Sequence, residues 1–314
     1  MDIQFTLNNY FKMGYENQPF TMRSKKEEIF FTQYLSCGRS TFDFRTECGL
    51  AAHQIAGVAA AASKPISIVY EGNPWSFSLM EIFRAAQIPF TVAVLRLHED
   101  KNIQFVSQAV HHCEEMGINY KLLNLNLNQI FESSSFIKIG LAFGCQYLTQ
   151  ALVIAQCAEL VKEGFFPVYG QGVPLLEKRK GAWICADREF HFSLFRFCIK
   201  NNISAVPSFF RWSPEIFFSV FNDSFAKALF TDPADLVTKF SQVERAYLSQ
   251  HFNLKDEKFF NGYEKIREYS TKYEKLFAQQ ALYPKQEIVT DCLTLLDQMK
   301  YSDKTRISDI KKAG

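Results

Sequence analysis

The sequence ISIVYEGNPWS (residues 66–76) decides the fold of this 314-residue chain. Four of its first five residues are β-branched or aromatic, which predicts a short strand over 66–70. Gly72 and Pro74 then predict a turn, and residues 76–86 predict a helix that begins near Ser76. The chain therefore passes from a strand through a glycine-bearing turn into a helix, as in the first unit of an α/β sheet.

The same alternation extends in both directions along the chain. Helices are predicted over 47–62, 76–86 and 102–116, with two more inside 137–163 that are broken near Gly144, and strands over 66–70, 90–97, 120–127 and 165–169. This spacing predicts an α/β fold, a parallel sheet with helices on both faces. Because ligands of such sheets bind at the carboxyl ends of the strands, the segments to examine are 71–76, 96–100 and 170–172.

These elements divide the chain into three parts. Residues 1–45 are predicted to be an N-terminal extension of short strands and loops, 46–230 the α/β domain, and 231–314 a mostly helical C-terminal region. Within the domain, Ser213-Pro214-Glu215 predicts a helix start, because serine caps, proline fits the first turn and glutamate faces the positive end of the dipole.

Composition argues against several classes of protein. The chain has 35 Lys and Arg against 33 Asp and Glu, a net charge of +2, so nucleic acid is not an expected partner. The 47% hydrophobic content argues against disorder. No apolar run reaches the ~18 residues of a membrane span, so no membrane is expected. Residues 1–4 lack the basic and apolar blocks of a secretory signal, and we expect a cytoplasmic protein.

The cysteines and phenylalanines add two expectations. Eight cysteines occur without a CxxC pair, which predicts reduced, mostly buried thiols and no metal site, although His111-His112-Cys113 could contribute ligands. The chain has 32 phenylalanines, and six of them crowd into residues 209–225, where they favour core packing first. An excess of this size also predicts contact with protein partners through a Phe-rich surface, with a homo-oligomer as one form of it.

The turn at residues 71–76 has two interpretations. A glycine-bearing turn before a helix that begins with serine can bind an anion, because free backbone N–H groups and the helix dipole point at it. In that interpretation Gly72, Asn73 and Ser76 would contact a phosphate. In the other, the turn is simply a capped strand-to-helix connection. Pro74 favours the second, since it removes one N–H donor.

From residue 43 to 268 the order of motifs resembles phage-encoded members of the PP-loop ATP pyrophosphatase (adenine nucleotide alpha hydrolase-like) superfamily, which includes asparagine synthetase and 7-cyano-7-deazaguanine synthase domains. The motifs that carry the resemblance are the helix 47–62, IVYEGNPWSFSLMEIFRAAQIPF (68–90), VAVLRL (92–97), HHCEEMGINY (111–120), GCQYLTQALVIAQCAEL (144–160), FPVYGQGVP (166–174), VPSFFRWSPEIFFSVFND (206–223) and NGYEKI (261–266). The resemblance implies a PP-loop or HUP-like fold that binds ATP, with Mg²⁺, and transfers AMP to a substrate oxygen.

The superfamily's loop reads Ser-Gly-Gly-x-Asp-Ser, and this chain departs from it. Glu71 stands for the first Ser, Asn73 for the second Gly and Trp75 for Asp, while Gly72 and Ser76 match. A glutamate beside phosphates costs binding energy by like charge, and Trp75 is expected to occlude the phosphate site. We therefore expect a degenerate loop without full ATP pyrophosphatase activity.

Further candidate nucleotide contacts lie at other strand and helix ends. Arg96 could contact a phosphate or form a surface ion pair, and Lys265 could lean over a nucleotide or be solvated. Gly170 and Gly172 could form the floor of a nucleotide crevice or a plain turn. Gln146 stands where the family usually has a small polar residue. Glu189, at a family acidic position, could bind a cation or a substrate amine, or be a solvated glutamate at a helix start.

Two functions follow from this sequence. The first is a phage-encoded pseudoenzyme or scaffold, located in a virion or in the host cytoplasm. In this protein the α/β fold is retained although the enzymatic activity is lost. The alternative is an active ATP-dependent adenylating enzyme of the ligase or amidotransferase kind that tolerates the altered loop.

Overall fold

The computed structural model describes residues 11–15, 29–34, 41–132, 134–170, 175–179, 182–186, 192–222, 245–254, 258–280 and 287–290. Its centre is a parallel four-stranded sheet of β3 (Ile66–Tyr70), β4 (Thr91–Leu97), β5 (Tyr120–Leu125) and β6 (Phe166–Tyr169), in the order β5-β4-β3-β6. The chain moves outward from β3 to β5 and returns on the other side of β3 as β6. The direction of winding therefore changes between β3 and β6.

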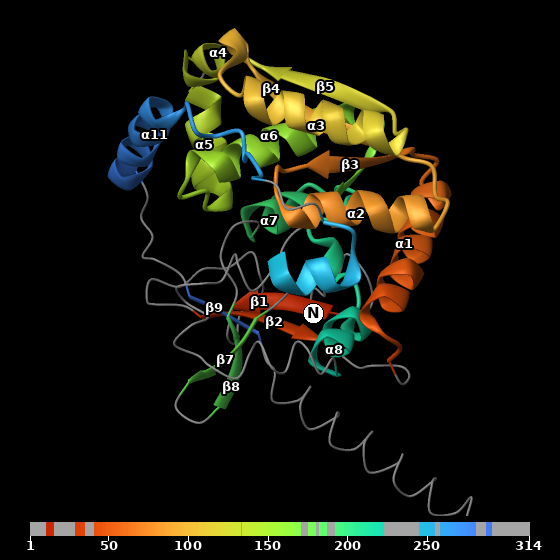
Figure 1. The fold of residues 1–314 in the computed structure, drawn as a ribbon. Helices are drawn as coiled ribbons and strands as arrows, with labels where there is room; N and C mark the ends of the chain where they lie inside the picture. The colour runs from red at the N-terminus through yellow and green to blue at the C-terminus, as the bar shows by residue number, and fades with distance from the viewer. Residues whose placement is uncertain are drawn as a thin grey trace, which may run out of the picture.

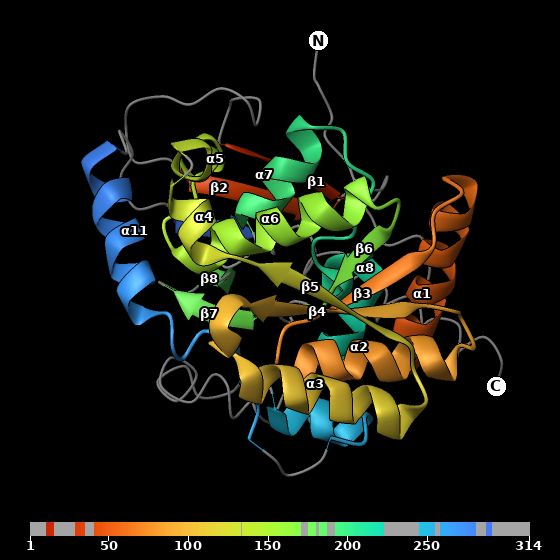
Figure 2. The same ribbon diagram turned by 90° about the horizontal axis from the view of Figure 1, so that it is seen from above.

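Helices flank this sheet on both faces, with α2 and α3 on one side and α6 on the other (Figure 2). The described helices are α1 (Phe44–Ala61), α2 (Pro74–Ala85), α3 (Ile103–Met116), α4 (Leu127–Glu132), α5 (Ser134–Phe143), α6 (Leu148–Lys162), α7 (Phe192–Lys200), α8 (Pro214–Asn222) and α11 (Arg267–Gln280). The structure also has short 3₁₀ turns η1 (His98–Asp100) and η3 (Phe209–Arg211) and a further helix over 245–251. The predicted α/β class, with its parallel sheet and two helical layers, is confirmed.

A second sheet joins distant parts of the chain in the order β1-β2-β9-β8-β7. Its strands are β1 (Phe11–Tyr15), β2 (Ile29–Tyr34), β7 (Leu175–Arg179), β8 (Ala182–Ala186) and β9 (Glu287–Thr290). Strand β9 pairs in parallel with β2 and antiparallel with β8. The sequence predicted strands in the N-terminal extension, but it predicted neither the β7–β8 hairpin nor a strand inside the C-terminal region.

Aromatic side chains of α1, α2 and η3 pack together in the core. Helices α1 and α2 lie next to each other in the ribbon (Figure 1). Phe209 and Phe210 are fully buried, with ring centroids 5.1 Å apart. Phe210 also stacks on Phe44 at 5.9 Å, and Phe209 contacts Phe83 at 5.8 Å. These two phenylalanines therefore belong to the core rather than to a contact surface. The side chains of the other phenylalanines of 209–225 lie outside the described residues.

Two chain-wide features concern the cysteines and the helices. The described cysteine side chains, Cys48, Cys113, Cys145, Cys157 and Cys198, are free and buried, as expected. Among the described residues, no single helix has the length and apolar character needed to cross a membrane. Residues 136–143 and α6 meet that test only together, as a pair bent by 102°, and most of α6 is buried in the core.

Candidate functional site

The turn from β3 into α2 is closed by its own hydrogen bonds. Asn73 caps the helix, since its Oδ1 accepts from the Ser76 amide at 2.8 Å, and the Ser76 hydroxyl donates to the Asn73 carbonyl at 3.0 Å. Ser76 is fully buried, and Pro74 supplies the first helical residue without an N–H. Of the donors that the anion-binding interpretation requires, the Ser76 amide and hydroxyl are therefore used inside the turn, and Pro74 supplies none.

Removing the cap tests this description of the turn. Asn73→Ala is expected to lower the free energy of unfolding by about 1 kcal/mol, because the Ser76 amide loses its side-chain acceptor. Asn73→Asp keeps an acceptor at the same place and is the matched control. Urea unfolding measures both. Equal stability of Asn73→Ala and wild type would show that the cap contributes nothing.

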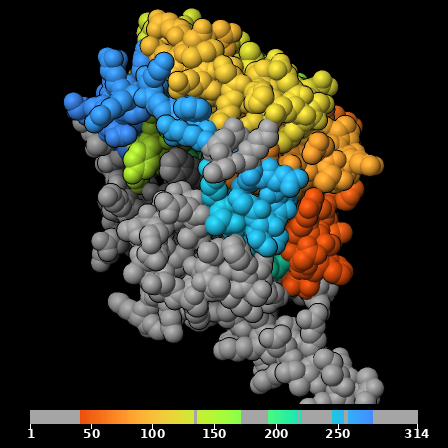
Figure 3. Space-filling view, viewed as in Figure 1, coloured from red at the N-terminus to blue at the C-terminus, as the bar shows by residue number. Residues whose placement is uncertain are grey.

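A segment from the C-terminal part of the chain, residues 258–263, lies directly on this turn. Gly72 has a left-handed backbone (φ +64°), and a methyl group added there would overlap the carbonyl oxygen of Phe260 and come within 2.8 Å of Cδ2 of Phe105. Gln108 of α3 holds the segment in place: its Nε2 donates to the Lys258 carbonyl at 2.8 Å, and its Oε1 accepts from the Phe260 amide at 3.1 Å. In the space-filling view, blue atoms of these C-terminal residues adjoin the yellow atoms of α3 (Figure 3).

The other side of the β3–β6 boundary is closed as well. A methyl group added at Gly170, directly after β6, would lie 2.9 Å from the carbonyl oxygen of Trp75. The end of β6 therefore packs against the first turn of α2. The Trp75 side chain turns into the core, where its ring lies 4.9 Å from that of Phe210. The indole thus belongs to the core, and the atoms next to Gly72 and Gly170 are backbone atoms of residues 260 and 75.

Glu71, at the start of the turn, and Tyr263, in the 258–263 segment, influence each other electrostatically. Burial raises the pKa of the Glu71 carboxyl well above its ordinary value. Burial also raises the pKa of the Tyr263 hydroxyl, and the Glu71 charge adds to this rise, as expected of neighbouring groups. Burial therefore disfavours the charged form of Glu71 at this turn.

Among the described residues, no contact joins the remaining sequence candidates into one site. Arg96 binds Asp100 through Nε at 3.0 Å and Nη2 at 2.7 Å, so the surface ion pair is the alternative that is observed. Lys265 is exposed, and Gln146 lies half-buried in the loop before α6. Gly172 and Glu189 lie outside the described residues.

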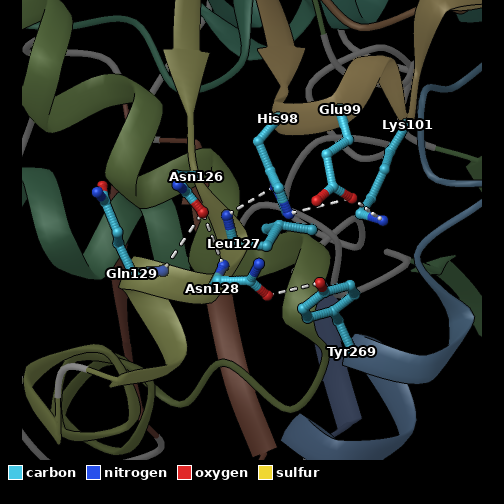
Figure 4. Close-up of polar contacts among 8 residues, drawn as sticks. All are labelled: His98, Glu99, Lys101, Asn126, Leu127, Asn128, Gln129 and Tyr269. Atoms are coloured by element: carbon cyan, nitrogen blue, oxygen red, sulfur yellow. Dashed lines mark hydrogen bonds and ion pairs between the residues drawn. The ribbon is translucent and has the colours of Figure 1, made fainter.

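A polar cluster that the sequence did not single out lies beyond the carboxyl ends of β4 and β5 (Figure 4). Nδ1 of His98, which follows β4, accepts from the Leu127 amide at 3.1 Å. Asn126, which follows β5, accepts through Oδ1 from the amides of Asn128 (3.0 Å) and Gln129 (3.4 Å). Both side chains thus hold the start of α4. The predicted segment 96–100 includes His98, but only the register of β4 with β5 brings it to Leu127.

The same cluster attaches α11 to the end of the sheet. The Tyr269 hydroxyl donates to Oδ1 of Asn128 at 2.7 Å, and its ring packs on the His98 ring at 6.1 Å. Lys101 lies over the Tyr269 ring at 5.7 Å and pairs with Glu99 at 2.9 Å. Glu99 has an unfavourable left-handed backbone (φ 56°), as has Asp100 (φ 50°). These contacts join chain segments to each other, which is a structural role.

The fold is that of an α/β protein with a four-stranded parallel sheet. At the carboxyl ends of β3 and β6, backbone atoms of residues 260 and 75 pack against Gly72 and Gly170. No known family model and no curated protein matches the sequence. Among solved structures, the chain is similar to NMN synthetase from Francisella tularensis, with 12% identity, a TM-score of 0.34, and coverage of 78% of this chain and 99% of that one.

Two further structures are similar at the same level. The NH3-dependent NAD synthetase of Campylobacter jejuni gives 11% identity and a TM-score of 0.32 over 68% of this chain and 94% of that one. The glutamine-dependent NAD+ synthetase of Acinetobacter baumannii, in complex with ADP, gives 11% identity and a TM-score of 0.31 over 46% of this chain. This chain spans only 30% of the Acinetobacter enzyme. Identities and TM-scores this low carry no inference about activity, substrate or family membership.

Proposed function

We propose that this chain is a non-catalytic α/β protein that acts as a scaffold through contacts with other protein chains. The observation that supports this proposal is the Phe260 carbonyl lying over Gly72, in the place where a phosphate would approach the turn. Ligands of parallel α/β sheets bind where the winding direction changes. In this chain, backbone atoms of residues 75, 170 and 260 pack together at that position. The proposal is therefore that the sheet has been retained and its ligand-binding crevice has not.

The alternative, an adenylating enzyme, requires two separate changes at this place. The 258–263 segment would have to leave Gly72, which breaks both hydrogen bonds to Gln108. The first turn of α2 would also have to move away from Gly170. Even then, Trp75 stands where the superfamily's loop has its acid, and the carboxyl of the turn, Glu71, stands at a different position of the loop. The resemblance in sequence order is the reason for proposing a phage particle as the setting of this scaffold.

Binding of ATP tests the proposal directly. We expect no heat of binding when Mg·ATP is titrated into the full chain, and no rise in Tm at millimolar Mg·ATP. A ligand present at 100 times its Kd would stabilise the fold by about 2.7 kcal/mol, which for a chain of this size is a shift of several degrees. Micromolar affinity would overturn the proposal and favour the enzyme.

A pyrophosphate assay separates the two functions further. If the chain were an enzyme, Ser76→Ala should abolish pyrophosphate release, because Ser76 is one of the two loop positions that match the superfamily. For a scaffold, wild type and Ser76→Ala are equally inactive. The variant then differs from wild type only through the lost hydrogen bond from the serine hydroxyl to the Asn73 carbonyl.

A further inference from the structure

Residues 258–263 form a segment that covers the turn between β3 and α2, and we call this segment the cover. Its Phe260 carbonyl lies on Gly72, and two hydrogen bonds to Gln108 attach it to α3. Apart from Gly262, which is buried, every residue of the cover is half-buried or exposed. A surface segment with so few buried contacts can open without the rest of the domain, because local opening costs less free energy than unfolding.

The carboxyl group of Glu71 lies next to the turn that the cover closes. Glu71 directly precedes Gly72, and its Oε2 atom is buried although the residue as a whole is half-buried. Burial raises the pKa of this carboxyl well above its ordinary value of 4.5. Burial also raises the pKa of the Tyr263 hydroxyl in the cover, and the charge of Glu71 raises it further. The charge of Glu71 is therefore felt by the cover itself.

We propose that one proton controls the cover: it lies on the turn while the Glu71 carboxyl is protonated, and it opens when this carboxyl ionises. The physical reason is that a buried carboxylate is costly, and an open cover admits the water that solvates it. A group whose pKa is raised in the closed state stabilises that state at low pH. This contribution is complete below the ordinary pKa of 4.5, and it is lost as the pH rises through the raised pKa of Glu71. Within that window, each unit of pH should favour the open cover about tenfold.

Other ionisable groups near the cover keep their charge between about pH 5.5 and pH 8. The hydroxyls of Tyr263 and of Tyr169, at the end of β6, have a raised pKa, so both stay protonated. Lysine and arginine lose their protons only above about pH 10, so the two cations that lie over phenylalanine rings of the cover, Arg245 and Lys258, stay positive. Glu264, just after the cover, is exposed, and exposed carboxylates are already ionised at about pH 5.5.

His112 of α3 is a further ionisable group beside the cover. Its Nδ1 lies 2.9 Å from the Tyr70 hydroxyl, and its ring packs on that of Phe259 at 6.0 Å. A second proton on His112 would disturb these contacts in acid, which is the opposite direction to the effect of Glu71. The neighbouring side chains of α3, Phe105 and Gln108, carry no charge, and neither does the first turn of α2. Opening with rising pH is therefore assigned to Glu71.

Glu71→Gln isolates this response, because glutamine has nearly the shape of a protonated glutamate and does not ionise. Hydrogen exchange of the full chain, followed by mass spectrometry, measures the opening of the cover, in which the Phe260 amide is bound to Gln108. The ratio of the exchange rates of wild type and Glu71→Gln should rise at least about tenfold from about pH 5.5 to pH 8. Any effect of His112 is present in both chains and cancels in this ratio. A ratio that is the same at both pH values would overturn the proposal.

Two controls separate opening of the cover from other effects. Glu114→Gln makes the same chemical change at an exposed position of α3, and its cover should exchange like that of wild type at both pH values. The amides of β4 report unfolding of the whole domain, and they should exchange more slowly than the cover at both pH values. If the cover and β4 open equally at both, the domain unfolds as one unit and the cover is not a separate device. A Glu114→Gln chain that behaves like Glu71→Gln would also contradict the role of Glu71.

Gln108→Ala tests how the cover is attached to α3. This variant loses both hydrogen bonds to the cover, and because the glutamine does not titrate, exchange of the cover should become about tenfold faster at both pH values. Exchange like that of wild type would contradict the attachment. The inference rests on the covered turn and not on the scaffold role. Binding of Mg·ATP to wild type would contradict the scaffold, whereas the exchange ratio, measured without nucleotide, would still decide the role of Glu71.

Discussion

Gly72→Ala is expected to lower the free energy of unfolding by about 3 kcal/mol. The left-handed backbone alone (φ +64°) costs a residue with a Cβ roughly 1–2 kcal/mol. The new methyl group also overlaps the Phe260 carbonyl, and the backbone shift that relieves such overpacking adds about 1–3 kcal/mol. Urea unfolding of the purified variant, with its midpoint and slope compared with wild type, measures the effect.

Gly117→Ala is the matched control for this experiment. Gly117 ends α3 with almost the same backbone angle (φ +65°), but a methyl group added there meets nothing within 4 Å. It should therefore lose only about 1 kcal/mol, from backbone strain. The difference between the two variants measures the contact with the 258–263 segment. Equal losses would mean that this segment does not occupy the space over the turn, and the scaffold proposal would lose its main support.

Trp75→Ala is expected to have the largest effect of any single change at the turn, about 4 kcal/mol. Trp75 is only 4% exposed, and its ring contacts that of Phe210. Removing the side chain therefore leaves a large cavity in the aromatic core. Trp75→Phe keeps a ring in the same place and should lose no more than about 1.5 kcal/mol. Thermal and urea unfolding measure both variants.

Binding measurements on the same variants separate packing from occlusion. Because the indole points into the core, its removal should destabilise the fold without creating a site for Mg·ATP. If Trp75→Ala binds Mg·ATP while wild type does not, the indole itself blocks the nucleotide, as the sequence suggested. A loss below about 1 kcal/mol for Trp75→Ala would contradict the core position of the side chain.

The sheet and its helices could be predicted because their signals are local. The alternation of buried strands with amphipathic helices gave β3, β4, β5 and β6 and the helices between them, and glycines such as Gly117 marked their ends. The interpretation of residues 71–76 as a capped turn also depended on neighbouring residues, since Asn73 and Ser76 are three apart and bond to each other.

What fills the turn could not be predicted, because it comes from a remote part of the chain. Nothing in the sequence near Gly72 indicates that the Phe260 carbonyl will lie on it, or that Gln108 will hold that segment. The contact of His98 with Leu127 depends in the same way on strand register. Strand β9 (EIVT) contains three β-branched residues, but a run of four is too short to predict a strand alone, and it gains its stability from the strands beside it.

The place of β9 between β2 and β8 has a consequence for how the protein is made. Residues 29–34 can find their parallel neighbour only after residue 290 has left the ribosome. Until β9 is synthesised, the edges of β2 and β8 that pair with it lack their hydrogen-bonding partner, while the domain around the four-stranded sheet can already fold. An exposed strand edge of this kind readily captures another chain. Nascent chains made on the same mRNA are therefore expected to exchange these strands. A chaperone that covers the unpaired strand edges would raise the yield of correctly folded protein.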